Sequence, residues 1–355
     1  MSRVIFVFFA LLSLAASPVR GQSQIHEACR PPAGESDRSP IIAIGVSAHH
    51  GNDREIEPFA LLQMEAASAW RGRHDEAAAN RAVLALVHWA RAGALGEIVE
   101  AANASSNINS IYSLRRTLIA ILGAWMDLRT APVGQIHAAE IERWLGGLIT
   151  LQDVATGAEK SRSRAGAVGN YNNLALLRAT ALAQWAVLTV NRELAERAEQ
   201  TSRATIDQIR IDGGLALEMA RGSLALWHQS HAIASLIYLA DLLRPFGWDL
   251  WEPRADGVDL HRAIAFLLDG IQKPRTLTAF ADGEAGLSQD LSFLVRRRNG
   301  RHYMAWGELY RARFPERVEA RRLVGLLSQV SEPGWPLIDD SMGGNTSCRI
   351  LTADP

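Results

Sequence analysis

The sequence predicts an all-α protein, an extended array or closed toroid of helices that follows an irregular N-terminal arm. Apolar residues recur at helical spacing in one segment after another between Phe59 and about Leu268. Glycine- and proline-containing breakers separate these segments. Segments such as 215–243 are apolar around most of their circumference, which is typical of helices packed between other helices. This pattern excludes a β-sandwich and a doubly wound sheet.

The first element in chain order is a predicted secretory signal peptide, residues 1–21. Arg3 precedes an apolar run from Val4 to about Ala16, and small, turn-forming residues follow. Cleavage is expected after Ala16 or after Gly21. Since no later segment is apolar enough to span a bilayer, we expect a periplasmic protein that does not interact with the membrane after cleavage.

An irregular arm, residues 22–58, comes next, and its one apolar run from Ile41 to Val46 predicts a short strand. Residues 59–355 then form one predicted helical domain, since nothing in them resembles an interdomain linker. The expected helices are 77–93, 111–129, 137–154, 172–189, 192–210, 215–243 and 258–270. No fixed-period repeat is visible, which argues against a tetratricopeptide-like solenoid.

Cys29 and Cys348 are the only cysteines in the chain. An exported protein can oxidise such a pair, so we expect a disulfide, with two unpaired thiols as the alternative.

The composition bears on possible ligands. The 355 residues carry 37 basic and 38 acidic side chains, and only Lys160 and Lys273 are lysines, so 35 of the basic residues are arginines. A net charge of −1 argues against a nucleic-acid partner, which would require a strong basic field. The arginine excess is typical of a GC-rich genome, but forked guanidinium donors also suit planar carboxylates.

Two polar interruptions of apolar helices mark candidate sites, because polar groups are costly to bury without partners. Asn172 and Asn173 begin one helix, where capping alone is the alternative explanation. In the other, Arg221 and His228 are seven residues apart, so one continuous helix would point both to the same face, with Glu218 on that stripe. His231 lies one turn further, and a core histidine paired with Glu218 remains an alternative.

The chain resembles the alginate lyases of polysaccharide lyase family 5. The likeness covers most of the chain after the leader and follows the order Cys29 with Pro31-Pro32, residues 44–53, 113–129, 141–148, Asn172-Asn173, Arg221-Gly222 to His228, residues 303–306, and residues 342–345. The resemblance implies an (α/α) toroid, an incomplete α/α barrel, with an N-terminal lid. It also implies β-elimination on an acidic polysaccharide.

By this resemblance, Asn173 and Arg221 neutralise the uronate carboxylate. The positions that transfer protons depart from the family pattern: Leu174 stands where the family has a histidine, and His228 where it has a tyrosine. Ala48-His49 replaces a Lys-Tyr pair of the lid, and Arg115-Arg116 replaces a Lys-Trp pair.

Elimination requires a neutral base for the C5 proton and neutralisation of the neighbouring carboxylate. An imidazole meets the first need near neutral pH. We therefore expect Asn173, Arg221 and His228 to be catalytic, with His228 acting as base and then acid. The residues expected to contact substrate are His49, Arg115, Arg116, Asn172, His231 and Trp306, and core packing is the alternative for Trp306.

No cofactor or metal is expected, since His49, His50 and Asp53 form too loose a pattern for a metal site. The predicted protein is a periplasmic lyase of mannuronan or a glucuronate-containing polymer, acting as a monomer. One alternative is a pseudoenzyme that binds polyuronate without cleaving it, and another is a helical interaction protein with no sugar ligand.

Overall fold

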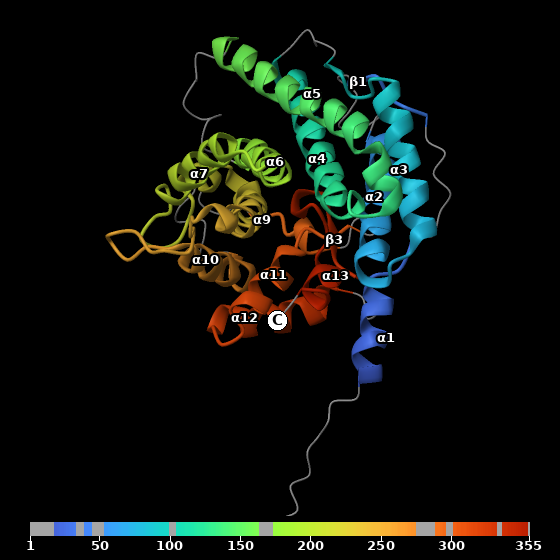
Figure 1. The fold of residues 1–355 in the computed structure, drawn as a ribbon. Helices are drawn as coiled ribbons and strands as arrows, with labels where there is room; N and C mark the ends of the chain where they lie inside the picture. The colour runs from blue at the N-terminus through green and yellow to red at the C-terminus, as the bar shows by residue number, and fades with distance from the viewer. Residues whose placement is uncertain are drawn as a thin grey trace, which may run out of the picture.

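The computed structural model describes residues 18–32, 39–44, 53–98, 104–162, 173–274, 288–295, 301–331 and 336–353. Two layers of helices curve around a common centre (Figure 1). The inner helices, each packed on the next, are α2 (Asp53–Arg73), α4 (Ala104–Leu128), α6 (Asn173–Thr189), α9 (Ala225–Leu243) and α11 (Trp306–Arg313). The outer helices are α3 (Glu76–Arg91), α5 (Pro132–Arg162), α7 (Arg192–Ile206), α10 (Leu260–Gln272) and α12 (Val318–Val330).

Sequence explains which helices lie inside. Helices α6 and α9 bury residues on nearly every side, because alanine, leucine and other apolar residues occupy most of their positions. Helix α7 buries one small-residue stripe and exposes charged residues on the remainder. Asp75, Asn191 and Asp259 accept backbone hydrogen bonds at the starts of α3, α7 and α10, so short polar side chains fix where these outer helices begin.

The arm before the toroid is partly regular. Helix α1 (Pro18–Ala28) was not expected, and α2 begins at Asp53, so the predicted domain boundary at residue 58 falls inside a helix. The predicted strand is present as β1 (Ala43–Ile44), which pairs in parallel with β2 (Glu97–Ile98). The predicted leader lies outside the described residues, apart from positions 18–21 in α1.

The C-terminal segment returns to the centre of the toroid. Strands β3 (Ile338–Asp339) and β4 (Gly344–Asn345) pair in antiparallel fashion around the 3-10 turn η7 (Asp340–Met342). This turn packs against α2, α4 and α9. On α4, a Cβ at Gly123 would lie 2.2 Å from the carbonyl oxygen of Gly343, so only glycine permits this approach.

The predicted disulfide is confirmed: Cys29 and Cys348 are bridged, and both are buried. The bridge joins the end of α1 to α13 (Thr346–Leu351). Among the described helices, none combines the length and hydropathy needed to cross a membrane.

The predicted helix 215–243 is divided. Helix α8 (Ala216–Met219) ends before Arg221, the 3-10 turn η3 (Gly222–Leu224) follows, and only then does α9 begin. Gly222 has φ of +60°, which a continuing α-helix cannot contain. The expectation that Arg221 and His228 share one helix face is therefore wrong.

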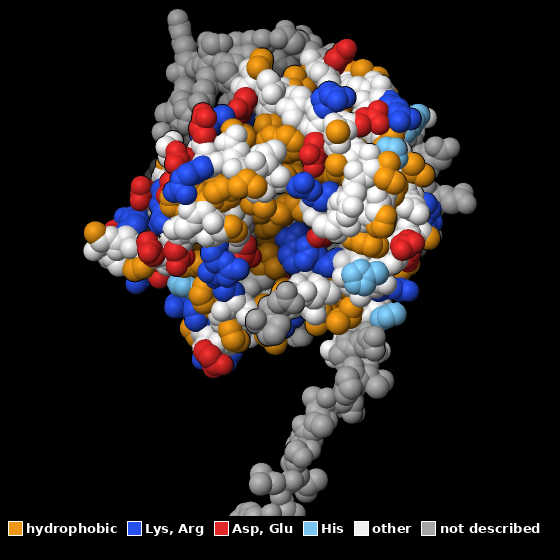
Figure 2. Space-filling model, viewed as in Figure 1, with side chains coloured by type: hydrophobic (Ala, Val, Ile, Leu, Met, Phe, Trp, Pro, Cys, Tyr) orange, Lys and Arg blue, Asp and Glu red, His pale blue; other side chains and the backbone are white. Residues whose placement is uncertain are grey.

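The face seen in Figure 2 is hollowed between the two sides of the curved array. Hydrophobic side chains lie at the bottom of this depression, and lysine or arginine side chains lie beside it.

Candidate active site

Three helices and the turn between two of them bring Asn173, Glu218, Arg221 and His228 together. Asn173 is the first residue of α6, Glu218 belongs to α8, and His228 lies in the first turn of α9. The turn between α8 and α9 carries Arg221. The break at Gly222 therefore replaces the continuous helix as the feature that sets the relative positions of Arg221 and His228.

Asn173 contacts two members of this cluster. Its backbone N–H donates to Glu218 Oε1 at 2.8 Å, and its side-chain Nδ2 lies 3.1 Å from His228 Nδ1. On the other side of Glu218, Oε2 lies 3.8 Å from Arg221 Nε. The predicted trio thus lies together around Glu218, which the sequence had suggested as a member of the same helix stripe or as the partner of a core histidine.

Burial changes the proton affinity of His228 and of Glu218. Desolvation, together with the positive charge of Arg221, lowers the pKa of His228 to about 4. Desolvation raises the pKa of Glu218 to about 7, against the opposing effects of the Asn173 N–H and Arg221. His228 is therefore neutral at neutral pH, as a base must be before it accepts a proton.

Aromatic side chains line the next part of the site. The Trp227 ring stacks on His231 with centroids 4.3 Å apart, and Tyr303 lies 4.9 Å from His231. Trp227 and Tyr303 are partly exposed, whereas His231 is buried beneath them. His231 therefore supports an aromatic surface beside His228, and Trp227 and Tyr303 present that surface.

Arg115 and Arg116 have internal partners. Arg115 donates to the carbonyl oxygen of Leu174 at 3.2 Å, which ties α4 to the first turn of α6. Arg116 pairs with Asp340, and so does Arg301, which also pairs with Glu57.

The cavity within that ion-pair cluster measures about 10 Å³, far too small for a sugar ring. Arg115 and Arg116 are almost completely buried. Contrary to the expectation of substrate contacts, they hold α4 to α6 and to the C-terminal segment, because a buried guanidinium requires such partners.

Trp306 also differs from its prediction. The side chain is fully buried, and its indole N–H donates to Ser230 Oγ at 3.3 Å. No ring face is available for a sugar, so the core-packing alternative describes this residue. The expected contacts His49 and Asn172 lie outside the described residues.

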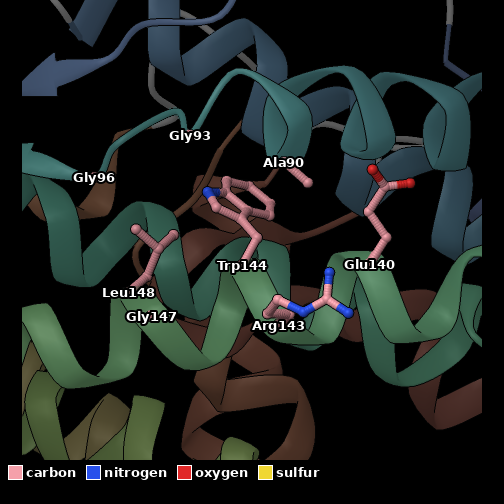
Figure 3. Close-up of a pocket in the computed structure, with 8 residues that line it drawn as sticks. All are labelled: Ala90, Gly93, Gly96, Glu140, Arg143, Trp144, Gly147 and Leu148. Carbon is pink, nitrogen blue, oxygen red and sulfur yellow. The ribbon is translucent and has the colours of Figure 1, made fainter.

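Cavities larger than the one within the ion-pair cluster lie elsewhere in the described part of the chain. One of about 380 Å³ lies between α3 and α5, where Trp144 and Leu148 face Gly93 and Gly96 (Figure 3). It contains none of the predicted site residues. Within the described ranges, no three histidine, cysteine or acidic side chains form a group that could hold a metal ion.

Sequence reasoning offered Glu218 only as the partner of a core histidine, included Tyr303 only in a segment that resembles the family, and gave Trp227 no role. An acidic residue inside an apolar stretch was the available signal for Glu218, because a buried carboxylate needs a partner. Trp227 adjoins His228 in sequence, whereas Tyr303 could be placed beside it only by the tertiary fold.

The known relatives include a polysaccharide lyase from Stenotrophomonas maltophilia, which is 30% identical over 245 residues. That alignment covers 68% of this chain and 65% of the relative, so it spans just under two thirds of the relative's length.

Among solved structures, a variant of alginate lyase A1-III complexed with a tetrasaccharide aligns with a TM-score of 0.72 at 19% identity. The alignment covers 93% of this chain and 89% of that one. Alginate lyase A1-III from Sphingomonas species A1 gives a TM-score of 0.70 at 19% identity, over 95% of this chain and 94% of that one. These likenesses confirm the (α/α) toroid.

The family profile described as alginate lyase matches residues 43–277, well over half of the chain. Together with the cluster around Asn173 and the toroid that positions it, this match shows that the chain belongs to the alginate lyase family, among the polysaccharide lyases.

Proposed function

We propose that this protein cleaves an acidic polyuronate by β-elimination, with a mannuronan-like or glucuronate-containing polymer as substrate. The observation that carries the proposal is the convergence of a guanidinium, an amide and a neutral imidazole at Asn173, Arg221 and His228. The substrates named for the relatives are consistent with it: alginate for the structures, and a polysaccharide for the curated relative.

The clamp on the substrate carboxylate would come from Arg221 and Asn173. The Arg221 side chain is 35% exposed, so part of its guanidinium remains available to a ligand while Glu218 faces the protein interior. Loss of the C5 proton places charge on the carboxylate, and positively charged or amide donors stabilise that charge.

His228 would serve as base and then as acid. In β-linked mannuronate or glucuronate, the C5 hydrogen and the O4 leaving group lie on one face, so a single imidazole can serve both. It accepts the C5 proton as the C4–C5 double bond forms and the bond from C4 to O4 breaks. The resulting imidazolium then protonates the departing oxygen.

The Asn173 amide determines which ring nitrogen of His228 can act. With Nδ2 donating to Nδ1, the neutral ring carries its proton on Nε2. If the amide turns so that Oδ1 accepts from Nδ1–H, the lone pair moves to Nε2. Among the described residues nothing donates to Asn173 Oδ1, so this rotation would give a buried acceptor its partner.

The test is incubation of the pure protein with polymannuronate, polyguluronate and glucuronan, read by the ultraviolet absorbance of the new double bond. We expect product from at least one polymer and loss of it in His228→Ala. The matched control is His88→Ala, on the exposed face of α3, which should keep the wild-type rate. Undiminished product from His228→Ala would remove His228 from the mechanism.

A second candidate function is polyuronate binding without cleavage. The aliphatic Leu174 next to Asn173 and the engaged Nδ1 of His228 favour it, because both reduce the groups free to transfer protons. Calorimetric binding of saturated oligouronates without any unsaturated product would establish this function in place of catalysis.

We further propose that residues 1–21 direct export to the periplasm. The expected result is a mature N-terminus at Ser17 or Gln22 in protein purified from the periplasmic fraction. Recovery of the full-length chain from the cytoplasm alone would contradict export.

A further inference from the structure

Glu218 is a buried acid at the centre of the cluster, and the mechanism above gives it no role. It is 2% exposed, and it lies between the first residue of α6 and the turn that carries Arg221. A carboxylate in such a place loses its hydration, so its contacts must compensate for that loss.

The two carboxylate oxygens have different neighbours. Oε1 accepts the hydrogen bond from the Asn173 N–H, which is one of the free donors at the start of α6. Oε2 faces the Arg221 guanidinium at 3.8 Å and accepts no hydrogen bond from the described residues. The same side chain therefore holds the backbone of one proposed clamp residue and attracts the charge of the other.

We infer that Glu218 is a positioning residue whose ionised carboxylate aligns Arg221 with Asn173, so that both face one uronate carboxylate of the substrate. This inference rests on the proposed function. It assigns Glu218 no contact with substrate, since Arg221 and Asn173 make those contacts.

Protonation of Glu218 should affect the two contacts unequally. A neutral carboxyl group can still accept from the Asn173 N–H through its carbonyl oxygen, but it loses the charge that attracts Arg221. Because burial raises the pKa of Glu218 to about 7, this change falls within the range in which the enzyme can be assayed.

Among the described residues, the other charged groups that act on Glu218 or lie in its cluster do not change over that range. Arg221, on the adjoining turn, stays protonated, and so does Arg115, which reaches the neighbouring Leu174 from α4. Helix α6 presents the uncharged backbone N–H of Asn173. His228 on α9, with a pKa of about 4, is already neutral. Glu218 is thus the group of this cluster expected to titrate near pH 7, whereas Glu65, whose pKa burial also raises to about 7, lies on α2 beside Arg30.

The sign of the pH effect follows. Below pH 7 Glu218 is increasingly protonated and Arg221 is released, so kcat/KM should fall as pH decreases through about 7. His228 alone would place that fall near pH 4.

The test compares the wild type with Glu218→Gln from pH 5 to 9. At pH 8 we expect kcat/KM to fall about tenfold or more in the variant, mostly through KM, since Gln keeps the acceptor but not the charge. The fall near pH 7 should disappear, and the two proteins should converge at pH 5. In Glu218→Asp, kcat/KM should still fall as pH decreases, because aspartate keeps an ionisable carboxyl group.

Glu308→Gln is the matched control. Glu308 is also buried with a raised pKa, but its partners are Thr346, Ser347 and Arg311, away from the cluster. This variant should keep the wild-type fall near pH 7. Calorimetric affinity for a saturated oligomannuronate at pH 6 and pH 8 supplies a readout that does not require turnover, and we expect tighter binding at pH 8 only when Glu218 is present.

The outcomes separate the two proposals. If the wild type is active and Glu218→Gln keeps both its rate and its fall in kcat/KM near pH 7, the positioning role is overturned and the proposed function stands. If Glu218→Gln is slower but keeps the fall in kcat/KM near pH 7, Glu218 has a purely structural role, and the positioning role is again overturned. Binding without product overturns cleavage, and the affinities then decide the role of Glu218. Absence of both binding and product overturns both proposals.

Discussion

At the scale of single residues, the site combines one exposed charge with one buried charge. Arg221 keeps part of its side chain in solvent while its partner Glu218 is enclosed. Two ionic residues that are adjacent in the fold thus have different roles, because only the exposed member can reach a ligand.

Arg221→Lys tests whether the site needs the two parallel donors of a guanidinium or only a positive charge. Lysine keeps the positive charge but cannot bind a carboxylate through two parallel donors. We expect kcat/KM on the preferred polyuronate to fall about tenfold or more, with the melting temperature nearly unchanged. Arg210→Lys, on a separate ion pair with Asp212, is the control and should leave the rate unaltered. A wild-type rate in Arg221→Lys would show that the two parallel donors are not needed.

Sequence reasoning placed Asn173, Arg221 and His228 together, and their catalytic roles stay predictions. It placed Arg116 wrongly because its partner Asp340 lies 224 residues further along the chain. No local pattern shows which charges neutralise one another in the folded interior. Trp306 illustrates the same limit, since its neighbours in sequence are the same whether its ring faces a sugar or Ser230.

At the scale of elements, the break between α8 and α9 is the feature that the helical pattern could not show. Apolar spacing continues through residues 215–243, so periodicity predicts one helix. The left-handed conformation of Gly222 interrupts it, and the carbonyl oxygen of Gly222 accepts from the Ala225 N–H within the 3-10 turn and from Gln289 Nε2 at 3.0 Å. A tertiary contact thus overrides a local preference for helix.

Gly222→Ala tests the importance of this turn. A Cβ at φ of +60° costs about 1–2 kcal/mol, and relief of that strain would move Arg221 relative to His228. We expect a small loss of stability with a much larger loss of rate. Gly257→Ala is the control, since Gly257 has φ of +78° with nothing within 4 Å of a Cβ, so it should lose stability and keep its rate. Equal rate losses in both variants would contradict a special role for the turn.

At the scale of the whole molecule, the apolar helical segments and their breakers were enough to predict an extended array or a closed toroid of helices, and the resemblance to alginate lyases selected the toroid. Burial all round the inner helices is the physical reason, because a helix without a polar face must be covered on every side. The course of the C-terminal segment through the centre was not predictable, since β3 and β4 are two residues long and carry no periodic signal.

Removal of the bridge by Cys29→Ser should lower the free energy of unfolding by about 2–5 kcal/mol, measured by guanidinium titration. Cys348→Ser should have the same effect, and the double variant should be no less stable than either single one, because all three lack one shared bond. Additive losses would mean that each cysteine contributes through other contacts.

The bridge between Cys29 and Cys348 spans 319 positions of sequence, and it converts the toroid from a linear array into a covalent ring. A linear helical array loses its terminal helices first, since these have neighbours on one side only. Here α1 and α13 are fastened to each other, so neither can separate from the body independently. Loss of either helix from the body therefore requires loss of the other, which makes fraying at this junction a cooperative event.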